Sequence, residues 1–171
     1  NELEPHTRCK PSGGPRQWLT PYGAEFVELP EAGVAYIFDI GGPHTYRTIY
    51  MDGRKHPEHL TPSYYGHSIG WWEGDTLVVD TKYFPGHHHW MDQGGASVPV
   101  SEDMHITERF TMRPDGGMDI EYQMTDPKNW EGEWKMTKRW RRVDERDIAE
   151  VSCLPDLNEN MPTVQSKENV R

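Results

Sequence analysis

Residues 66–81 read GHSIGWWEGDTLVVDT, and this stretch decides the fold of the chain. Its two halves are rich in β-branched and aromatic residues and read as β-strands. Gly74 and Asp75 separate the halves and favour a tight turn, because both residue types suit turn conformations. The stretch therefore predicts a β-hairpin, with His67 at its start.

A period of two continues along most of the chain. Met118, Ile120, Tyr122 and Met124, for example, alternate with polar residues, as in a strand with one buried face. Further strands are expected within 34–40, 46–50, 105–113, 133–143 and 147–152. Residues 84–103 carry Gly, Pro and His without a strand pattern, apart from one short helical turn at 101–104.

About eight short strands with almost no helix indicate an all-β fold. We expect one domain spanning residues 1–171, with an irregular arm at 1–23 and a polar tail at 155–171. The strands form an antiparallel meander, closed or nearly closed as a calycin- or lipocalin-like barrel. A barrel of about eight strands can hold one small ligand inside.

The amino-acid composition argues against some classes of binding partner. The chain has 28 Asp and Glu against 18 Lys and Arg, a formal net charge of −10, which disfavours nucleic acid and anionic membrane surfaces. No apolar run of about 18 residues is present, so we expect no transmembrane segment. Cys9 and Cys153 are either a disulfide in an oxidising compartment or two unrelated buried thiols. Barrels often bring their ends together, which favours the disulfide.

Two charged residues fall on faces that should be apolar. Glu108 shares a face with Ile106 and Phe110, and Lys138 shares one with Trp140. A charge facing a core is costly unless it is paired or functional. Glu108 is therefore either a structural partner of a base or a polar group in a ligand cavity. Desolvation favours the neutral form of a carboxyl group, so in a cavity it could act as an acid or base.

Histidines supply the other candidates for chemistry. His67 is either a core histidine bonded to a backbone carbonyl or a proton-transfer residue, since histidine changes charge near neutral pH. Asp92 in the following loop is its expected partner, and the catalytic set is completed by His105 and Glu108. The aromatic and basic residues expected to line the ligand cavity are Trp71, Trp90, Tyr122, Trp134, Lys138 and Trp140.

A transition-metal site for zinc or copper is the alternative use of the histidines. His87, His88 and His89 are consecutive, and either His56 or His105 would complete the set. Consecutive strand residues point in alternate directions, so at most two of the triplet reach one ion easily. No metal motif of fixed spacing is present.

The chain resembles a group of exported bacterial proteins without an established activity. The shared blocks are RTIYMDGRKHP at 47–57, the hairpin stretch at 66–81, WMD at 90–92 and HITERF at 105–110. The resemblance covers roughly residues 5–155 and implies a periplasmic or secreted protein, which fits the disulfide interpretation. The group often has Pro-His-Ser where this chain has Pro99-Val100-Ser101, so a histidine is missing there.

Three hypotheses follow. The first is an exported barrel that holds a small apolar or aromatic molecule; its His and Glu residues slightly favour acid/base catalysis of an isomerase, hydratase or lyase type, without an organic cofactor. The second is a metal-binding or metal-dependent periplasmic protein that uses the His-rich loop. The third is an accessory subunit of an envelope complex or a homo-oligomer, with the arm and tail as docking segments.

Overall fold

The computed structural model describes residues 5, 9–14, 16–19, 23–39, 45–91 and 97–144. Within these residues the chain is almost entirely β, as predicted. The helical pieces are α1 (Arg16–Leu19) and the 3₁₀ turn η2 (Pro30–Ala32). The strands are β1 (Ala24–Leu29), β2 (Val34–Asp39), β3 (Tyr46–Tyr50), β4 (His67–Glu73), β5 (Thr76–Lys82), β6 (His88–Met91), β7 (Ser97–Val100), β8 (His105–Met112), β9 (Met118–Thr125) and β10 (Trp134–Trp140).

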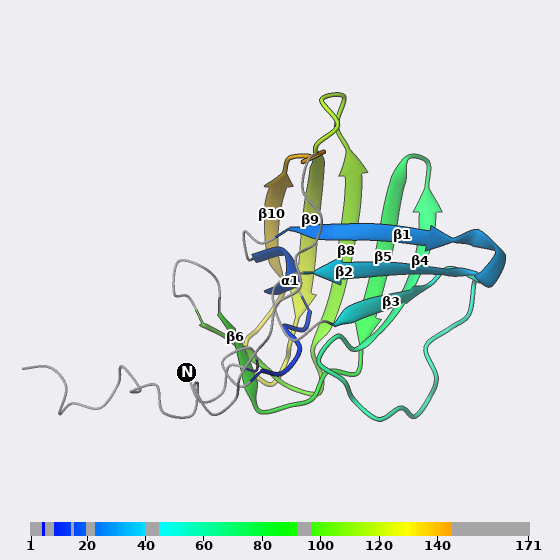
Figure 1. The fold of residues 1–171 in the computed structure, drawn as a ribbon. Coiled ribbons are helices and arrows are strands. Elements are labelled where there is room, and N and C mark those ends of the chain that lie inside the picture. Colours follow the sequence, from blue (N-terminus) through cyan, green and yellow to red (C-terminus); the bar gives the residue numbers. More distant parts are fainter. Residues whose placement is uncertain are drawn as a thin grey trace, which may run out of the picture.

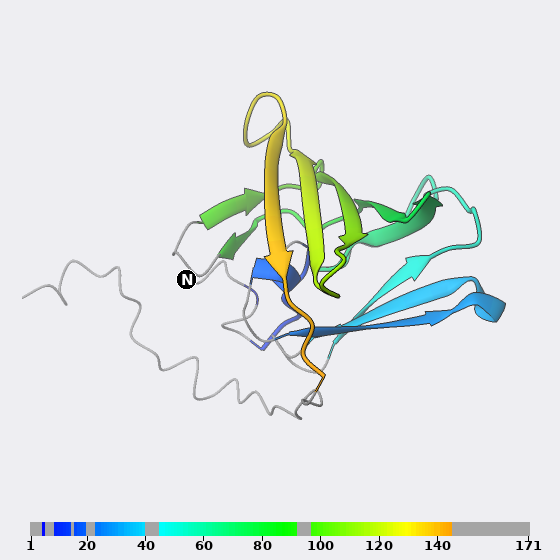
Figure 2. The same ribbon diagram turned by 90° about the horizontal axis from the view of Figure 1, so that it is seen from above.

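Eight strands form one sheet in the order β1-β2-β3-β4-β5-β8-β9-β10, and β6 pairs with β7 separately. The sheet curls into a half-barrel, so that β1 and β2 lie across from β8 to β10 (Figures 1 and 2). All neighbours are antiparallel except β3 and β4, which pair in parallel at two positions. The predicted all-β fold is confirmed. The expected closure is not observed, because the described strands show no pairing between β1 and β10.

The hairpin predicted from residues 66–81 is present as β4 and β5. Glu73 pairs with Thr76 across a two-residue loop, and Gly74 in that loop has a φ of 61°. This conformation is open to glycine without steric cost. Ser68 consequently lies opposite Thr81, and Ile69 lies opposite Asp80.

The concave face of the sheet carries the core. Its apolar side chains come from alternate positions of the strands, such as Ile49, Val79 and Ile120, which are fully buried. Trp18 of α1 fills the space between the sheet's two ends; its ring lies 5.4 Å from that of Phe26 on β1 and 5.7 Å from that of Trp140 on β10. Aromatic packing thus covers the gap that hydrogen bonding leaves open.

Two parts of the sequence prediction need comment. The segment 84–103, expected to lack strands, contains β6 and β7, with fully buried Trp90 on β6. Its His-, Gly- and Pro-rich composition hides a hairpin only four residues long on each side. The strand expected at 147–152 and the tail at 155–171 lie outside the described residues.

Candidate functional site

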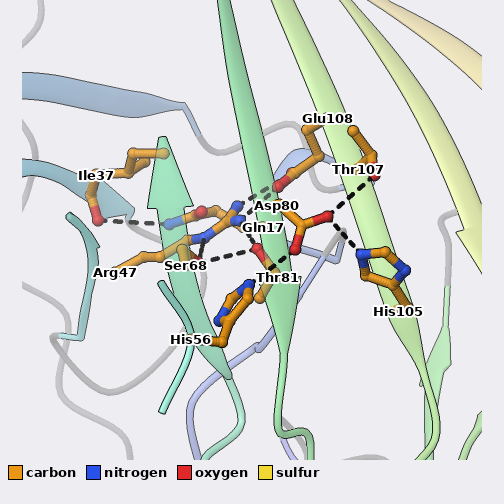
Figure 3. Close-up of polar contacts among 10 residues, drawn as sticks. All are labelled: Gln17, Ile37, Arg47, His56, Ser68, Asp80, Thr81, His105, Thr107 and Glu108. Atoms are coloured by element: carbon orange, nitrogen blue, oxygen red, sulfur yellow. Dashed lines mark hydrogen bonds and ion pairs between the residues drawn. The ribbon is translucent and has the colours of Figure 1, made fainter. Parts of the chain in front are cut away.

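Two polar clusters lie on opposite faces of the same strands. Successive residues of a strand point to opposite faces, so Asp80 projects from the convex face while its neighbour Thr81 projects into the concave core. His67 and Ser68 on β4 divide in the same way. Figure 3 shows Arg47, Ser68, Thr81 and Glu108 of the first cluster and His56, Asp80, His105 and Thr107 of the second.

The concave cluster is a buried ion pair with its hydrogen-bond partners. Arg47 on β3 donates to both carboxylate oxygens of Glu108 on β8, and the two side chains are each 1% exposed. The guanidinium also donates to Ser68 Oγ at 3.0 Å and to Thr81 Oγ1 at 2.7 Å. The pair connects β3 with β8, and each buried charge depends on the other for compensation. Burial and the nearby Glu108 charge raise the pKa of Tyr122 well above its ordinary value.

The convex cluster is a chain of hydrogen bonds. His67 Nδ1 lies 2.8 Å from His56 Nδ1, and His56 Nε2 lies 2.7 Å from Asp80 Oδ1. The other carboxylate oxygen of Asp80 is bonded to His105 Nε2 and, at 3.4 Å, accepts from Thr107 Oγ1. The side chains of His56 and Asp80 are only 12% and 17% exposed, whereas that of His105 is 37% exposed. The chain therefore runs from a buried histidine to one that reaches solvent.

The donor and acceptor roles follow from the carboxylate. Ionised Asp80 can only accept, so both His56 and His105 hold a proton on Nε2. With His56 neutral, its Nδ1 offers a lone pair, and Nδ1 of His67 donates to it. This leaves Nε2 of neutral His67 unprotonated, which makes that atom the basic end of the chain.

The pKa shifts of His67 and Asp80 agree with the states given to these two residues. Burial lowers the pKa of His67, and the neighbouring His56 and Arg54 lower it further. Burial acts to raise the pKa of Asp80, but hydrogen bonds from His105 and His56 outweigh it, and the net pKa is lowered. At neutral pH the site thus holds a neutral His67 and a charged Asp80.

A pocket of about 680 Å³ lies beside His67 on the convex side. Tyrosine side chains dominate its wall; burial and then Asp39 raise the pKa of one of them, Tyr65. The Tyr50 ring stacks on the His67 imidazole, with centroids 4.9 Å apart, and Arg54 covers Tyr50 at 4.0 Å. The lining residues are Pro11, Thr45, Tyr46, Thr48, Tyr50, Leu60, Pro62, Ser63, Tyr64, Tyr65, Gly66, His67 and Pro85. None of these carries a fixed charge.

The structure brings together two of the four predicted catalytic residues. His67 and His105 belong to one hydrogen-bonded chain, although they meet through Asp80 and His56 rather than directly. Glu108 lies on the other face and forms an ion pair with Arg47. Of the two roles considered for Glu108, this is the pairing with a base rather than a place in a ligand cavity. Asp92 lies outside the described residues.

Sequence reasoning missed Asp80 and Arg47. Asp80 is one of several strand carboxylates, and nothing local marks it as the acceptor for two histidines. Arg47 occupies an inward position between Tyr46 and Thr48, as Glu108 does on its own strand. A basic residue at an inward-facing position of another strand was therefore the sequence feature that could have identified the partner of Glu108.

The predicted ligand-lining residues do not surround one cavity. Trp90 and Tyr122 are packed in the core, while Trp71 and Trp134 are each 41% exposed. Lys138 and Trp140 are half-buried on β10. Core side chains occupy the space where the cavity inside the barrel was expected. The pocket beside His67 lies on the convex face instead.

The predicted metal ligands are also separated. His56 belongs to the Asp80 chain, His88 packs between the rings of Tyr64 and Trp90, and His89 bonds to Ser97. The remaining member, His87, is an exposed residue with a φ of 65°. Within the described ranges, no group of three or more His, Cys, Asp or Glu side chains is arranged to hold a metal ion.

The disulfide stays a prediction, because Cys153 lies beyond the described residues while Cys9 lies within them. In the part of the chain that the structure describes, no helix is long and apolar enough to span a bilayer. Comparisons with known protein families, with curated proteins and with solved structures each return no match.

Proposed function

We propose that this protein binds a small neutral aromatic molecule in the tyrosine-lined pocket and performs acid/base chemistry on it, with His67 as the base. The observation that carries the proposal is the hydrogen-bonded series His67–His56–Asp80, whose end residue His67 forms part of the pocket wall. Perturbed titratable groups that converge on an apolar pocket are typical of catalytic sites.

The proton transfers follow from the tautomers. Nε2 of His67 takes a proton from the ligand, and the Nδ1 proton of His67 passes to Nδ1 of His56. His56 is then a cation whose Nε2–H faces the Asp80 carboxylate 2.7 Å away. The carboxylate at this short distance stabilises the positive charge of His56. A buried imidazolium without such a partner would lack this stabilisation. Delivery of the proton from His67 to a different carbon of the ligand is the step that an isomerase requires. In D₂O, exchange of the Nε2 proton of His67 with solvent before the steps reverse places deuterium on the ligand.

The wall of the pocket supports a neutral, aromatic ligand. Tyrosine rings offer stacking surfaces, and prolines and Leu60 add apolar area. The described lining side chains themselves carry no fixed charge, which favours a neutral ligand over an ionic one. The cations beside the wall, Arg54 and Lys10, lie over the rings of Tyr50 and Tyr64. A volume of about 680 Å³ lies within the range of small-molecule sites.

The proposal is tested with acetophenone and 2-indanone, neutral aromatic ketones with exchangeable carbon-bound protons. We expect the protein to accelerate their hydrogen–deuterium exchange in D₂O, followed by NMR. His67→Gln should reduce the acceleration by about 10²-fold or more, because positioned bases contribute on that scale. Asp80→Asn should reduce it less, since it removes the counter-charge but leaves the base.

His89→Gln is the matched control, because His89 is hydrogen-bonded to Ser97 and takes no part in the His67–His56–Asp80 hydrogen bonds. Its exchange rate should equal that of the wild type. Exchange that survives His67→Gln unchanged would rule out His67 as the base. Saturable binding of the ketones without any exchange would reduce the function to ligand binding.

The proposed location is periplasmic or extracellular. It is supported by the resemblance to exported bacterial proteins and by the pair of cysteines near the two ends of the sequence.

A further inference from the structure

Asp80 is shared by two histidines that have different access to solvent. His56 bonds one carboxylate oxygen and His105 bonds the other. His56 leads to the pocket through His67, whereas His105 lies on the far side of Asp80 and is 37% exposed. The carboxylate is therefore the point where solvent conditions can influence the buried base.

His105 cannot serve as a proton exit from the pocket in this arrangement. Ionised Asp80 accepts a hydrogen bond at each oxygen, so both facing nitrogens already hold protons. A proton that moved from His56 to the carboxylate would find no free lone pair on the His105 nitrogen that faces it. His105 can therefore act on the base only through hydrogen bonding and charge.

Resting on the proposed function, we propose that His105 is a positioning residue that sets the basicity of the His67–His56 pair by competing with it for the charge of Asp80. The hydrogen bond that His105 donates to one oxygen of Asp80 draws on the same carboxylate that would stabilise protonated His56 at the other oxygen. The charge available to stabilise protonated His56 then falls, and His67 becomes a weaker base. Removing His105 should have the opposite effect.

The other groups around the cluster leave Asp80 as its counter-charge. Arg54, in the 51–66 loop, lowers the pKa of His67 and is itself ion-paired with Asp52. Lys82 is the β5 partner of His67 in the pairing register and is exposed. Asp103, near His105 in sequence, is paired with Lys128. The remaining neighbours carry no formal charge at neutral pH: Tyr50 on β3, Ile69 on β4, Tyr83 after β5, Thr107 on β8, and Gln123 and Thr125 on β9.

The test follows the His67 imidazole by NMR during a pH titration of protein labelled with ¹⁵N-histidine. His105→Phe removes the hydrogen bond to Asp80, and we expect the midpoint of the His67 titration to rise by roughly one pH unit. His105→Gln keeps a neutral donor without a titratable charge, so its midpoint should rise by a smaller amount. His89→Gln should leave the midpoint where it is.

The acid limb of the ketone exchange profile gives a second readout. A base with a higher pKa is already protonated, and therefore inactive, at a higher pH. In His105→Phe the acid limb should therefore shift to higher pH by the same amount as the midpoint of the His67 titration. A purely structural role for His105 would lower the rate at every pH without moving the limb. Chemical-shift dispersion equal to that of the wild type shows that each variant is folded.

The outcomes separate the two proposals. A His67 midpoint that is unchanged or lowered in both His105 variants overturns the role of His105, whatever the exchange activity. A raised midpoint in a protein that never exchanges ketone protons supports the coupling through Asp80 and contradicts the catalytic function.

Discussion

At the scale of single residues, the Arg47–Glu108 pair is the most sensitive point of the core. Arg47 makes two bonds to Glu108 and further bonds to Ser68 and Thr81, all of them buried. Removing one partner leaves the other charge buried without compensation. Removing both charges leaves two hydroxyl groups that can still bond to each other, since Ser68 Oγ lies 2.9 Å from Thr81 Oγ1.

We expect Arg47→Met to lower the free energy of unfolding by about 3–5 kcal/mol, because isolated buried charges cost this much. The double variant Arg47→Met/Glu108→Leu should recover most of the loss. Urea unfolding of the two single variants and the double variant completes a double-mutant cycle. Equal losses that simply add in the double variant would mean that the two side chains do not depend on each other.

At the scale of elements, a single short helix completes the half-barrel. α1 is only four residues long, yet its Trp18 contacts β1, β8 and β10 through Phe26, Phe110 and Trp140. No other described aromatic residue contacts rings from all three of these strands. The helix thus joins β1 and β10, the end strands of the sheet, which are not paired with each other among the described residues.

Trp18→Ala should therefore destabilise the fold by about 3–5 kcal/mol, the usual cost of emptying a large core site. Trp18→Phe retains part of the ring packing and should cost less. Thermal and urea unfolding monitored by circular dichroism provide the measurement. A loss below about 1 kcal/mol for the alanine variant would show that the ends of the sheet hold together without α1.

At the scale of the whole molecule, the pH dependence of stability should reveal a buried histidine. His88 is 5% exposed between Tyr64 and Trp90, and burial lowers its pKa from 6.5 to about 4. Between pH 6.5 and about 4, His88 is therefore protonated in the unfolded chain but neutral in the folded protein. The free energy of unfolding should fall with decreasing pH, by up to about 3 kcal/mol at pH 4.

His88→Phe keeps a ring at this site and removes the titration, so its unfolding free energy should depend less steeply on pH between 6.5 and 4. Part of the slope should remain, since the pKa of His67 is lowered as well. His59→Gln, at an exposed position, should retain the full wild-type slope. Parallel wild-type and His88→Phe curves would contradict the assignment of this slope to His88.

The proportion of the molecule that could be predicted differs between fold and site. The hairpin at 66–81, the all-β class and the inward position of Glu108 were predictable, because a strand's alternation is written in its own residues. The short β6–β7 hairpin escaped, because four-residue strands rich in His and Gly carry too little alternation to detect. The parallel pairing of β3 with β4 escaped as well, because local patterns do not reveal strand direction.

The sequence by itself determined which residues face the core and which face outward along most strands. Only the tertiary structure decided which of them meet. Arg47 and Glu108 are 61 residues apart, and Asp80 gathers His56 and His105 from opposite sides along the chain. Such meetings depend on strand order and register, which are set by the packing of the whole sheet. For this reason His67 and His105 were visible as candidates, while the carboxylate that links them was not.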